Sequence, residues 1–124
     1  MARILLVEDN ELNRDMISRR LARHGLEVLT AVDGTEGLEM AITLQPDLVL
    51  LDMSLPGLTG WQVVERIRKT PNIDHTPVIA LTAHAISGDR ERILQAGCDE
   101  YESKPVNMPR LLEKIHALLD RASR

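Results

Sequence analysis

The chain has 124 residues and a formal net charge of −4, which is enough length for one domain with its own core, spanning residues 1–124. The acidic balance argues against nucleic acid or an anionic membrane as the main partner, because binding to either requires a basic patch. The single cysteine, Cys98, rules out an intramolecular disulfide and suits a reducing compartment, and the first apolar run is too short for a signal peptide. We therefore expect a cytoplasmic protein that does not bind membranes.

The first half of the chain alternates between strand and helix signals. Apolar residues 4–7 predict a buried strand, and Asn10 can cap a helix that ends near His24. Residues 26–31 predict a second strand, and residues 34–45 a second helix that stops before a proline. Two sets of apolar side chains are predicted to face inward from these helices: Leu12, Met16, Ile17 and Leu21 on the first, and Leu38, Ala41 and Ile42 on the second.

The alternation continues through the middle of the chain. Residues 48–52 predict a third strand, and Thr59 can cap a helix that is broken at Thr70 and the following proline. Residues 78–81 predict a fourth strand, and residues 87–96 a helix that stops at a glycine.

The last strand is predicted at residues 100–103, and the last helix begins at Pro109, because proline suits the first helical position. This helix carries a predicted buried stripe of Leu111, Leu112, Ile115, Leu118 and Leu119. The strands are short apolar runs without polar alternation, which is typical of a parallel sheet covered by helices on both faces. The predicted fold class is therefore α/β, a (βα)5 doubly wound parallel sheet.

Polar side chains follow four of the predicted strands. Glu8 and Asp9 follow the first, Asp52 ends the third, Thr82 follows the fourth and Lys104 follows the fifth. In an open parallel sheet the ligand site lies outside the carboxyl ends of the strands, so these side chains should meet in one crevice. Two carboxylates about 4 Å apart repel each other by roughly 4 kcal/mol at an effective dielectric near 20, so bringing the three acids together is unfavourable. The pattern predicts a phosphoryl-transfer site.

These motifs resemble the receiver domain of two-component response regulators. The resemblance rests on Glu8-Asp9, on Asp52 within Leu-Asp-Met-Ser-Leu-Pro-Gly, on Thr82-Ala83 and on Lys104-Pro105, which occur in the right order along the whole chain. Residues 88–101 further resemble stand-alone receivers of the DivK type and receivers attached to hybrid histidine kinases. The family implies a flavodoxin-like strand order of 2-1-3-4-5.

The resemblance implies that Asp52 is the phosphorylation site. It would take a phosphoryl group from a phosphohistidine on a sensor histidine kinase or a histidine phosphotransfer protein. The implied cofactor is Mg²⁺, bound directly by Asp9 and Asp52, through water by Glu8, and by the main-chain carbonyl of Ser54. Ser54 replaces the larger polar residues often found there in the family, so the rate of dephosphorylation stays open. Such a domain is a phosphoacceptor that assists its own phosphotransfer and dephosphorylation, and is not an enzyme.

Lys104 and Thr82 complete the implied catalytic set. Lys104 would pair with the phosphoryl group as a point cation, and Pro105 after it fits a cis peptide bond. Thr82 would donate a hydrogen bond to a phosphoryl oxygen, and Tyr101 would then rotate inward into the space left behind. The alternative for Tyr101 is static packing of its ring.

Histidines need separate interpretation. His84 follows Thr82 by two residues and would lie beside the phosphoryl site, where it could affect water access and so the lifetime of the acyl phosphate. The alternative is a solvent-exposed neighbour without that role. The other three histidines, His24, His75 and His116, show no metal-ligand spacing and are expected at the surface. Trp61 is expected to pack at the start of its helix.

The implied function is a single-domain receiver that signals by phosphorylation-dependent contact with another protein. The resemblance places the contact surface on the fourth helix, fifth strand and fifth helix, around Ile86–Arg92, Tyr101 and the outer side of Arg110–Arg121. A phosphorelay intermediate, an allosteric regulator of a kinase and a domain of a hybrid kinase all remain open. The alternative function is a scaffold of the same fold that binds a partner protein without being phosphorylated.

Two other classes with strand-end sites fit the sequence less well. A haloacid-dehalogenase-type phosphatase needs a second aspartate two residues after its nucleophile as general acid, and Ser54 stands at that place. A flavodoxin-like FMN carrier needs a hydroxyl- and glycine-rich phosphate loop after the first strand. The corresponding segment here is Glu8-Asp9-Asn10, whose charge would repel phosphate without a metal.

Overall fold

Strands and helices alternate along the chain, as the sequence predicts. In the computed structural model, which describes residues 2–83 and 89–122, the strands are Arg3–Val7 (β1), Glu27–Ala31 (β2), Leu48–Asp52 (β3), Val78–Thr82 (β4) and Glu100–Ser103 (β5). The helices are Glu11–Arg23 (α1), Gly34–Leu44 (α2), Gly60–Arg68 (α3), Asp89–Gln95 (α4) and Met108–Ala122 (α5). Among the described residues, no helix combines the length and the apolar character needed to cross a membrane.

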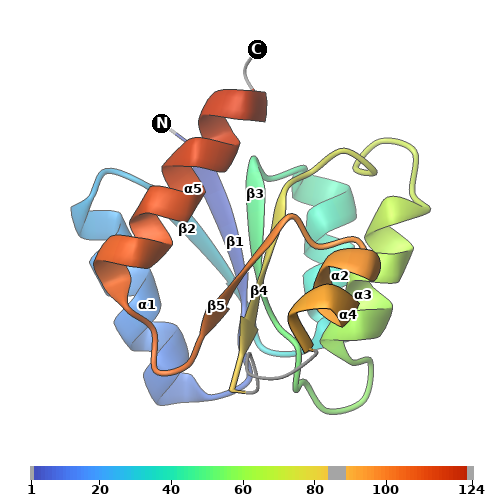
Figure 1. Cartoon of the computed structure of the whole chain (residues 1–124), viewed down its shortest axis with the longest axis horizontal. Coiled ribbons are helices and arrows are strands. Elements are labelled where there is room, and N and C mark those ends of the chain that lie inside the picture. The colour runs from blue at the N-terminus through green and yellow to red at the C-terminus, as the bar shows by residue number, and fades with distance from the viewer. Residues whose placement is uncertain (1, 84–88, 123–124) are drawn as a thin grey trace.

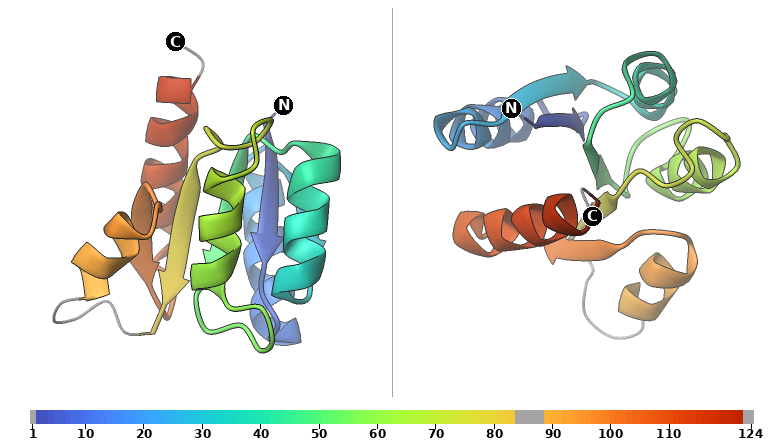
Figure 2. Two further views of the ribbon diagram at one scale, coloured as in Figure 1. Left: turned by 90° about the vertical axis from the view of Figure 1, so that its right-hand side faces the viewer. Right: turned by 90° about the horizontal axis from the view of Figure 1, so that it is seen from above.

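The strands form one parallel sheet in the order β2-β1-β3-β4-β5, which confirms the predicted fold class and strand order. Helices α1 and α5 cover one face of the sheet, and α2, α3 and α4 cover the other (Figures 1 and 2). Each face has its own apolar core, because β1, β3 and β4 send alternate side chains into opposite layers. The central strands are therefore buried on both sides, which explains their continuous apolar runs.

Side-chain caps fix where the helices begin. Asn10 Oδ1 accepts a hydrogen bond from the Asn13 N–H at 2.9 Å, and Thr59 forms a capping box with Gln62, so both predicted caps are confirmed. The prediction for the last helix was wrong by one residue. Helix α5 begins at Met108, because Asn107 Oδ1 accepts from the Arg110 N–H at 3.0 Å and acts as its cap.

Two side chains that were predicted to face inward are exposed. Leu12 is 81% exposed, because the buried positions of α1 begin more than a turn later, at Ile17. Ile42 is 44% exposed, because α2 approaches the sheet through its small residues and turns its larger aliphatic side chains partly outward. At the small position Gly37, an added Cβ would lie 2.8 Å from Val7, so the helix and the strand are in close contact there.

The expected surface positions of three histidines and the packing of Trp61 agree with the structure. Three histidines, His24, His75 and His116, are exposed. Trp61 is half-buried and packs against the core near the start of α3. Cys98 is 5% exposed, and burial raises the pKa of its thiol to about 12, so it remains a protonated, packed side chain.

Candidate functional site

The carboxyl ends of the strands bring the predicted polar residues to one edge of the sheet. Carboxylate oxygens of Glu8, Asp9 and Asp52 lie within 4.8 Å of one another. Lys104 joins them because β5 is paired with β4 up to its end, where the Lys104 N–H donates to the Thr82 carbonyl at 2.8 Å. The peptide bond between Lys104 and Pro105 is cis, as the sequence suggested. The convergence that the strand-end pattern predicts is therefore present.

A buried ion pair lies at the centre of this cluster. Lys104 Nζ is 3.0 Å from Asp52 Oδ2 and 3.0 Å from Glu8 Oε1. Burial alone would lower the pKa of Lys104, but the carboxylates of Asp52 and Glu8 outweigh it and raise that pKa. The lysine is therefore a permanent cation beside both acids.

Asp52 is held in its ionised form. Its side chain is nearly fully buried, and Oδ1 accepts a hydrogen bond from the Ser54 N–H at 2.9 Å. Burial opposes ionisation, but the Ser54 N–H and the Lys104 ammonium outweigh it and hold the pKa of Asp52 below its usual range. A carboxylate that stays charged at neutral pH and is fixed at both oxygens is a well-positioned nucleophile.

Glu8 is the member of the cluster whose charged form is least favourable. It is completely buried, and burial together with the neighbouring Asp52 charge raises its pKa. Its Oε2 accepts from the Asn10 N–H at 3.1 Å, whereas among the described residues Oε1 receives no hydrogen bond of good geometry. Glu8 Oε1 is ion-paired with the Lys104 ammonium but accepts no well-aligned hydrogen bond, and such a buried oxygen, set among hard carboxylate ligands, fits a divalent cation such as Mg²⁺.

The raised pKa of Glu8 predicts a pH-dependent cost to stability. An acid whose pKa is higher in the folded state binds more protons there, so stability falls as the pH rises from the unfolded pKa, about 4.3, towards the folded one. We expect Glu8→Gln to be more stable than the wild type without divalent cations, by a margin that grows across that pH window. Urea denaturation in EDTA at several pH values measures it, with the exposed Glu11→Gln as control. A margin that does not change with pH would contradict the prediction.

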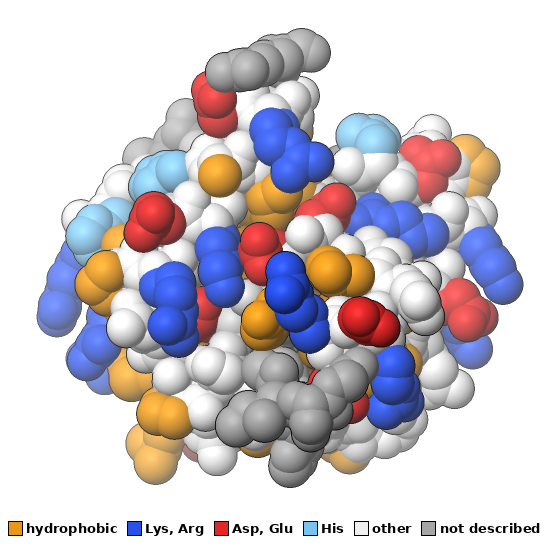
Figure 3. Space-filling model, in the orientation of Figure 1, with side chains coloured by type: hydrophobic (Ala, Val, Ile, Leu, Met, Phe, Trp, Pro, Cys, Tyr) orange, Lys and Arg blue, Asp and Glu red, His pale blue; other side chains and the backbone are white. Residues whose placement is uncertain are grey.

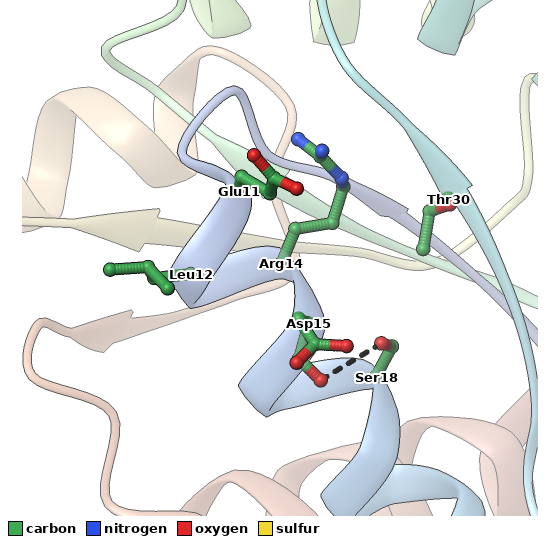
Figure 4. A pocket seen from close by; sticks show the side chains of 6 residues that line it. All are labelled: Glu11, Leu12, Arg14, Asp15, Ser18 and Thr30. Carbon is green, nitrogen blue, oxygen red and sulfur yellow. Dashed lines mark hydrogen bonds between the residues drawn. The ribbon is translucent and has the colours of Figure 1, made fainter.

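Arg14 is a site residue that sequence interpretation missed. Its Nη1 donates to the Glu8 carbonyl at 2.9 Å and lies 3.4 Å from the Asp9 carbonyl, so it holds the segment that presents both acids. The same side chain lines a surface pocket of about 300 Å³ (Figure 4). The pocket is lined by Glu11, Leu12, Arg14, Asp15, Ser18 and Thr30. A charged residue in the first turns of a helix gives no sequence signal for such a role, because most such residues are solvated.

The structure describes only part of the predicted switch, which consists of Thr82, Tyr101 and their surroundings. Thr82 is buried at the end of β4, and Tyr101 on β5 is half-buried against the core, with Lys114 Nζ 5.0 Å from the centre of its ring. The structure shows one arrangement of Tyr101, so its rotation stays a prediction. His84 lies outside the described residues, as do Ile86 and the two residues after it in the expected contact surface.

Comparison with known proteins identifies the family. Residues 4–116 match the family model described as "Response regulator receiver domain". The polar-differentiation response regulator DivK of Brucella anthropi is 40% identical over 116 residues, which cover 94% of each chain. The family is one of signalling domains rather than of metabolic enzymes.

Solved structures agree with this assignment. The receiver domain of a sensor histidine kinase from Pseudomonas aeruginosa, with a magnesium ion coordinated in its active site cleft, has 37% identity and a TM-score of 0.89, with coverage of 96% of this chain and 98% of that one. Vibrio cholerae chemotaxis protein CheY4 has 30% identity and a TM-score of 0.89, with coverage of 95% and 98%. With the fold, the strand-end cluster and these relatives in agreement, the chain belongs to the receiver domains of response regulators, which act in two-component signalling.

Proposed function

We propose that Asp52 accepts a phosphoryl group from a phosphohistidine on a sensor histidine kinase or a histidine phosphotransfer protein. A carboxylate oxygen of Asp52 would form the new bond to phosphorus as the bond to the imidazole nitrogen breaks, which gives an acyl phosphate and a free histidine. The observation that carries the proposal is the state of Asp52, an ionised carboxylate with Lys104 Nζ at 3.0 Å and the Ser54 N–H at 2.9 Å. Phosphoryl transfer depends mainly on such positioning and charge neutralisation.

The acidic cluster is proposed to hold Mg²⁺. Asp9 and Asp52 would bind it directly, Glu8 through water and Ser54 through its carbonyl, and the bound ion would neutralise charge on the phosphoryl oxygens. The hydrogen-bond deficit of Glu8 Oε1 supports this assignment from the protein side. A relative of this chain has magnesium coordinated in its cleft.

The other polar residues would act once the phosphoryl group is in place. Lys104 would exchange its contact with the Asp52 carboxylate for one with a phosphoryl oxygen, at little cost because it is already desolvated beside the nucleophile. Thr82 would donate a hydrogen bond from its hydroxyl to a second phosphoryl oxygen. Tyr101 would then rotate inward into the space left by the Thr82 side chain. Moving such an equilibrium from 1:99 to 99:1 takes about 5.5 kcal/mol. Phosphorylation adds only about one negative charge to the aspartate, so most of this energy must come from the new bonds.

The output surface is proposed to lie on α4, β5 and α5. This face carries lysine, arginine and acidic side chains in a mixture rather than as a patch of one sign (Figure 3). Mixed charge favours a partner protein with a matching pattern over a polyanion. The lifetime of the acyl phosphate, set in this proposal by Ser54 and His84, would decide how long the surface stays switched.

Intact-protein mass spectrometry after incubation with acetyl phosphate and Mg²⁺ tests the proposal. We expect one added phosphoryl group, and none in Asp52→Asn or in EDTA, because the first lacks the nucleophile and the second the cation. Asp74→Asn, an exposed aspartate in a loop, is the matched control and should behave as the wild type. If no phosphoryl group were added under any condition, including with a phosphorylated donor protein, the phosphorylation-independent scaffold would be the better interpretation.

A further inference from the structure

Strand β5 carries a second buried carboxylate close to Lys104. Glu102 lies two residues before Lys104, and its side chain is completely buried. Neither the strand-end pattern nor the proposed phosphoryl transfer uses this residue. A buried carboxylate is unfavourable unless it is paired, so its partners need an explanation.

Arg110 and Lys114 of α5 pair with Glu102 and leave neither oxygen free. Arg110 Nε lies 3.1 Å from both carboxylate oxygens, and Arg110 Nη2 donates to Oε2 at 2.9 Å. Lys114 Nζ donates to Oε1 at 3.0 Å. Within residues 2–83 and 89–122, Oε2 accepts hydrogen bonds only from Arg110. Removing Arg110 would therefore leave one oxygen of a fully buried carboxylate unpaired.

The strand geometry places Lys104 on the same face of β5 as Glu102. Side chains two residues apart in a strand lie on the same face, with Cα atoms about 7 Å apart. Pairing with β4 extends to the Lys104 N–H, so this alternation reaches from Glu102 to Lys104, while Tyr101, the residue just before Glu102, packs into the opposite core layer. Lys104 is flexible and carries a compact charge that can pair with either carboxylate. Glu102 is therefore a potential competitor of Asp52 for Lys104.

We infer that Arg110 is a positioning residue for phosphoryl transfer. By binding both oxygens of Glu102, it prevents this carboxylate from drawing Lys104 away from Asp52. The planar guanidinium suits this role, because its fixed fork binds both oxygens at once, which a lysine at the same place would not do. The inference rests on the proposed function of Lys104 and Asp52, and adds a residue that contacts neither the phosphoryl group nor the acidic cluster.

The competition can be separated from simple bracing of α5 against β5 by a pair of variants. Arg110→Met leaves Glu102 without its bidentate partner, and we expect it to slow phosphorylation by acetyl phosphate about tenfold, less than the roughly hundredfold loss that a misplacement of a reacting group by about 1 Å can cause. Glu102→Val removes the competitor, and we expect both this variant and the double variant Glu102→Val/Arg110→Met to react within about twofold of the wild type. Arg20→Met, an exposed arginine on α1, is the control.

Recovery of the phosphorylation rate in the double variant is the result that simple bracing of α5 against β5 does not predict. If the ion pair served only to brace the helix, Glu102→Val would slow the reaction as much as Arg110→Met, and the double variant would not recover. That result would overturn the inference, and so would an Arg110→Met variant that reacts at the wild-type rate. If Arg110→Met does not fold, Arg110→Lys replaces it, with the same expected order of rates.

A second measurement does not depend on phosphorylation. The NMR signal of the Lys104 ammonium, assigned with Lys104→Arg, should move in Arg110→Met relative to the wild type and return in the double variant. An unchanged signal in Arg110→Met would overturn the inference. If the wild type failed to accept phosphate, the proposed function would fall, and the NMR comparison would still decide whether Arg110 controls the partner of Lys104.

Discussion

Replacing Lys104 with methionine is expected to lower the free energy of unfolding by about 2–4 kcal/mol at neutral pH without divalent cations. Lys104 Nζ lies 3.0 Å from both Glu8 and Asp52, and its side chain is 21% exposed. Methionine keeps much of the packing of the aliphatic stem but removes the charge. The buried carboxylates would then face each other with no cation between them, which accounts for the size of the loss.

Urea denaturation in EDTA measures this loss, and two comparisons identify its cause. The loss should be smaller in an Asp52→Asn background, because one of the repelling charges is then absent. Added Mg²⁺ should recover part of it, since an ion that binds the folded state stabilises that state. Lys69→Met, at a lysine that is 75% exposed, should change stability little. An unchanged stability in Lys104→Met would show that the lysine does not neutralise the cluster.

A methyl group at Gly60 is expected to disturb both the fold and the nucleophile. Gly60 is the first residue of α3, and an added Cβ would lie 2.5 Å from the Asp52 carbonyl oxygen and 2.6 Å from Met53 Cα. Both neighbours are backbone atoms of the segment that presents Asp52, so they cannot move aside without moving the site. We expect Gly60→Ala to cost about 2–3 kcal/mol of stability and to slow phosphorylation about tenfold or more.

Gly57→Ala, in the loop just before α3, is the matched control for Gly60→Ala. Gly57 has φ +69°, which disfavours alanine, but an added Cβ there meets nothing within 4 Å. This variant should lose about 1–2 kcal/mol from backbone strain alone and should keep the wild-type rate of phosphorylation at temperatures where it is folded. Equal rates for the two variants would contradict the claim that the close approach of α3 positions Asp52.

The regular part of the fold could be predicted because it depends on local pattern. Unbroken apolar runs such as residues 48–51 mark strands that are buried on both faces, and caps such as Asn10 mark where helices start. Helix faces were less predictable. The helical period alone places Leu12 and Ile42 on the same faces as buried residues. In the structure, the buried positions of α1 begin only at Ile17, and α2 approaches the sheet through small residues.

The candidate site was predictable where chain position alone brings residues together. Glu8 and Lys104 follow strands of one parallel sheet and Asp52 ends another, and such strands all end at the same edge. The supporting contacts follow a different logic. The pairing of Glu102 with Arg110 depends on how α5 packs on β5, and the importance of Gly60 depends on backbone atoms from another segment. Neither contact is marked by a periodic pattern or a fixed residue spacing in the sequence.

The most direct test of the central claim is to locate the phosphoryl group chemically. Borohydride reduces an aspartyl phosphate to homoserine, which is stable to digestion and can be located by peptide sequencing in the mass spectrometer. After incubation with acetyl phosphate and Mg²⁺, we predict homoserine at position 52 and unmodified Glu8 and Asp9. Reduction at either of those acids instead, or a phosphorylated protein with intact Asp52, would contradict the assignment of Asp52 as the phosphoacceptor.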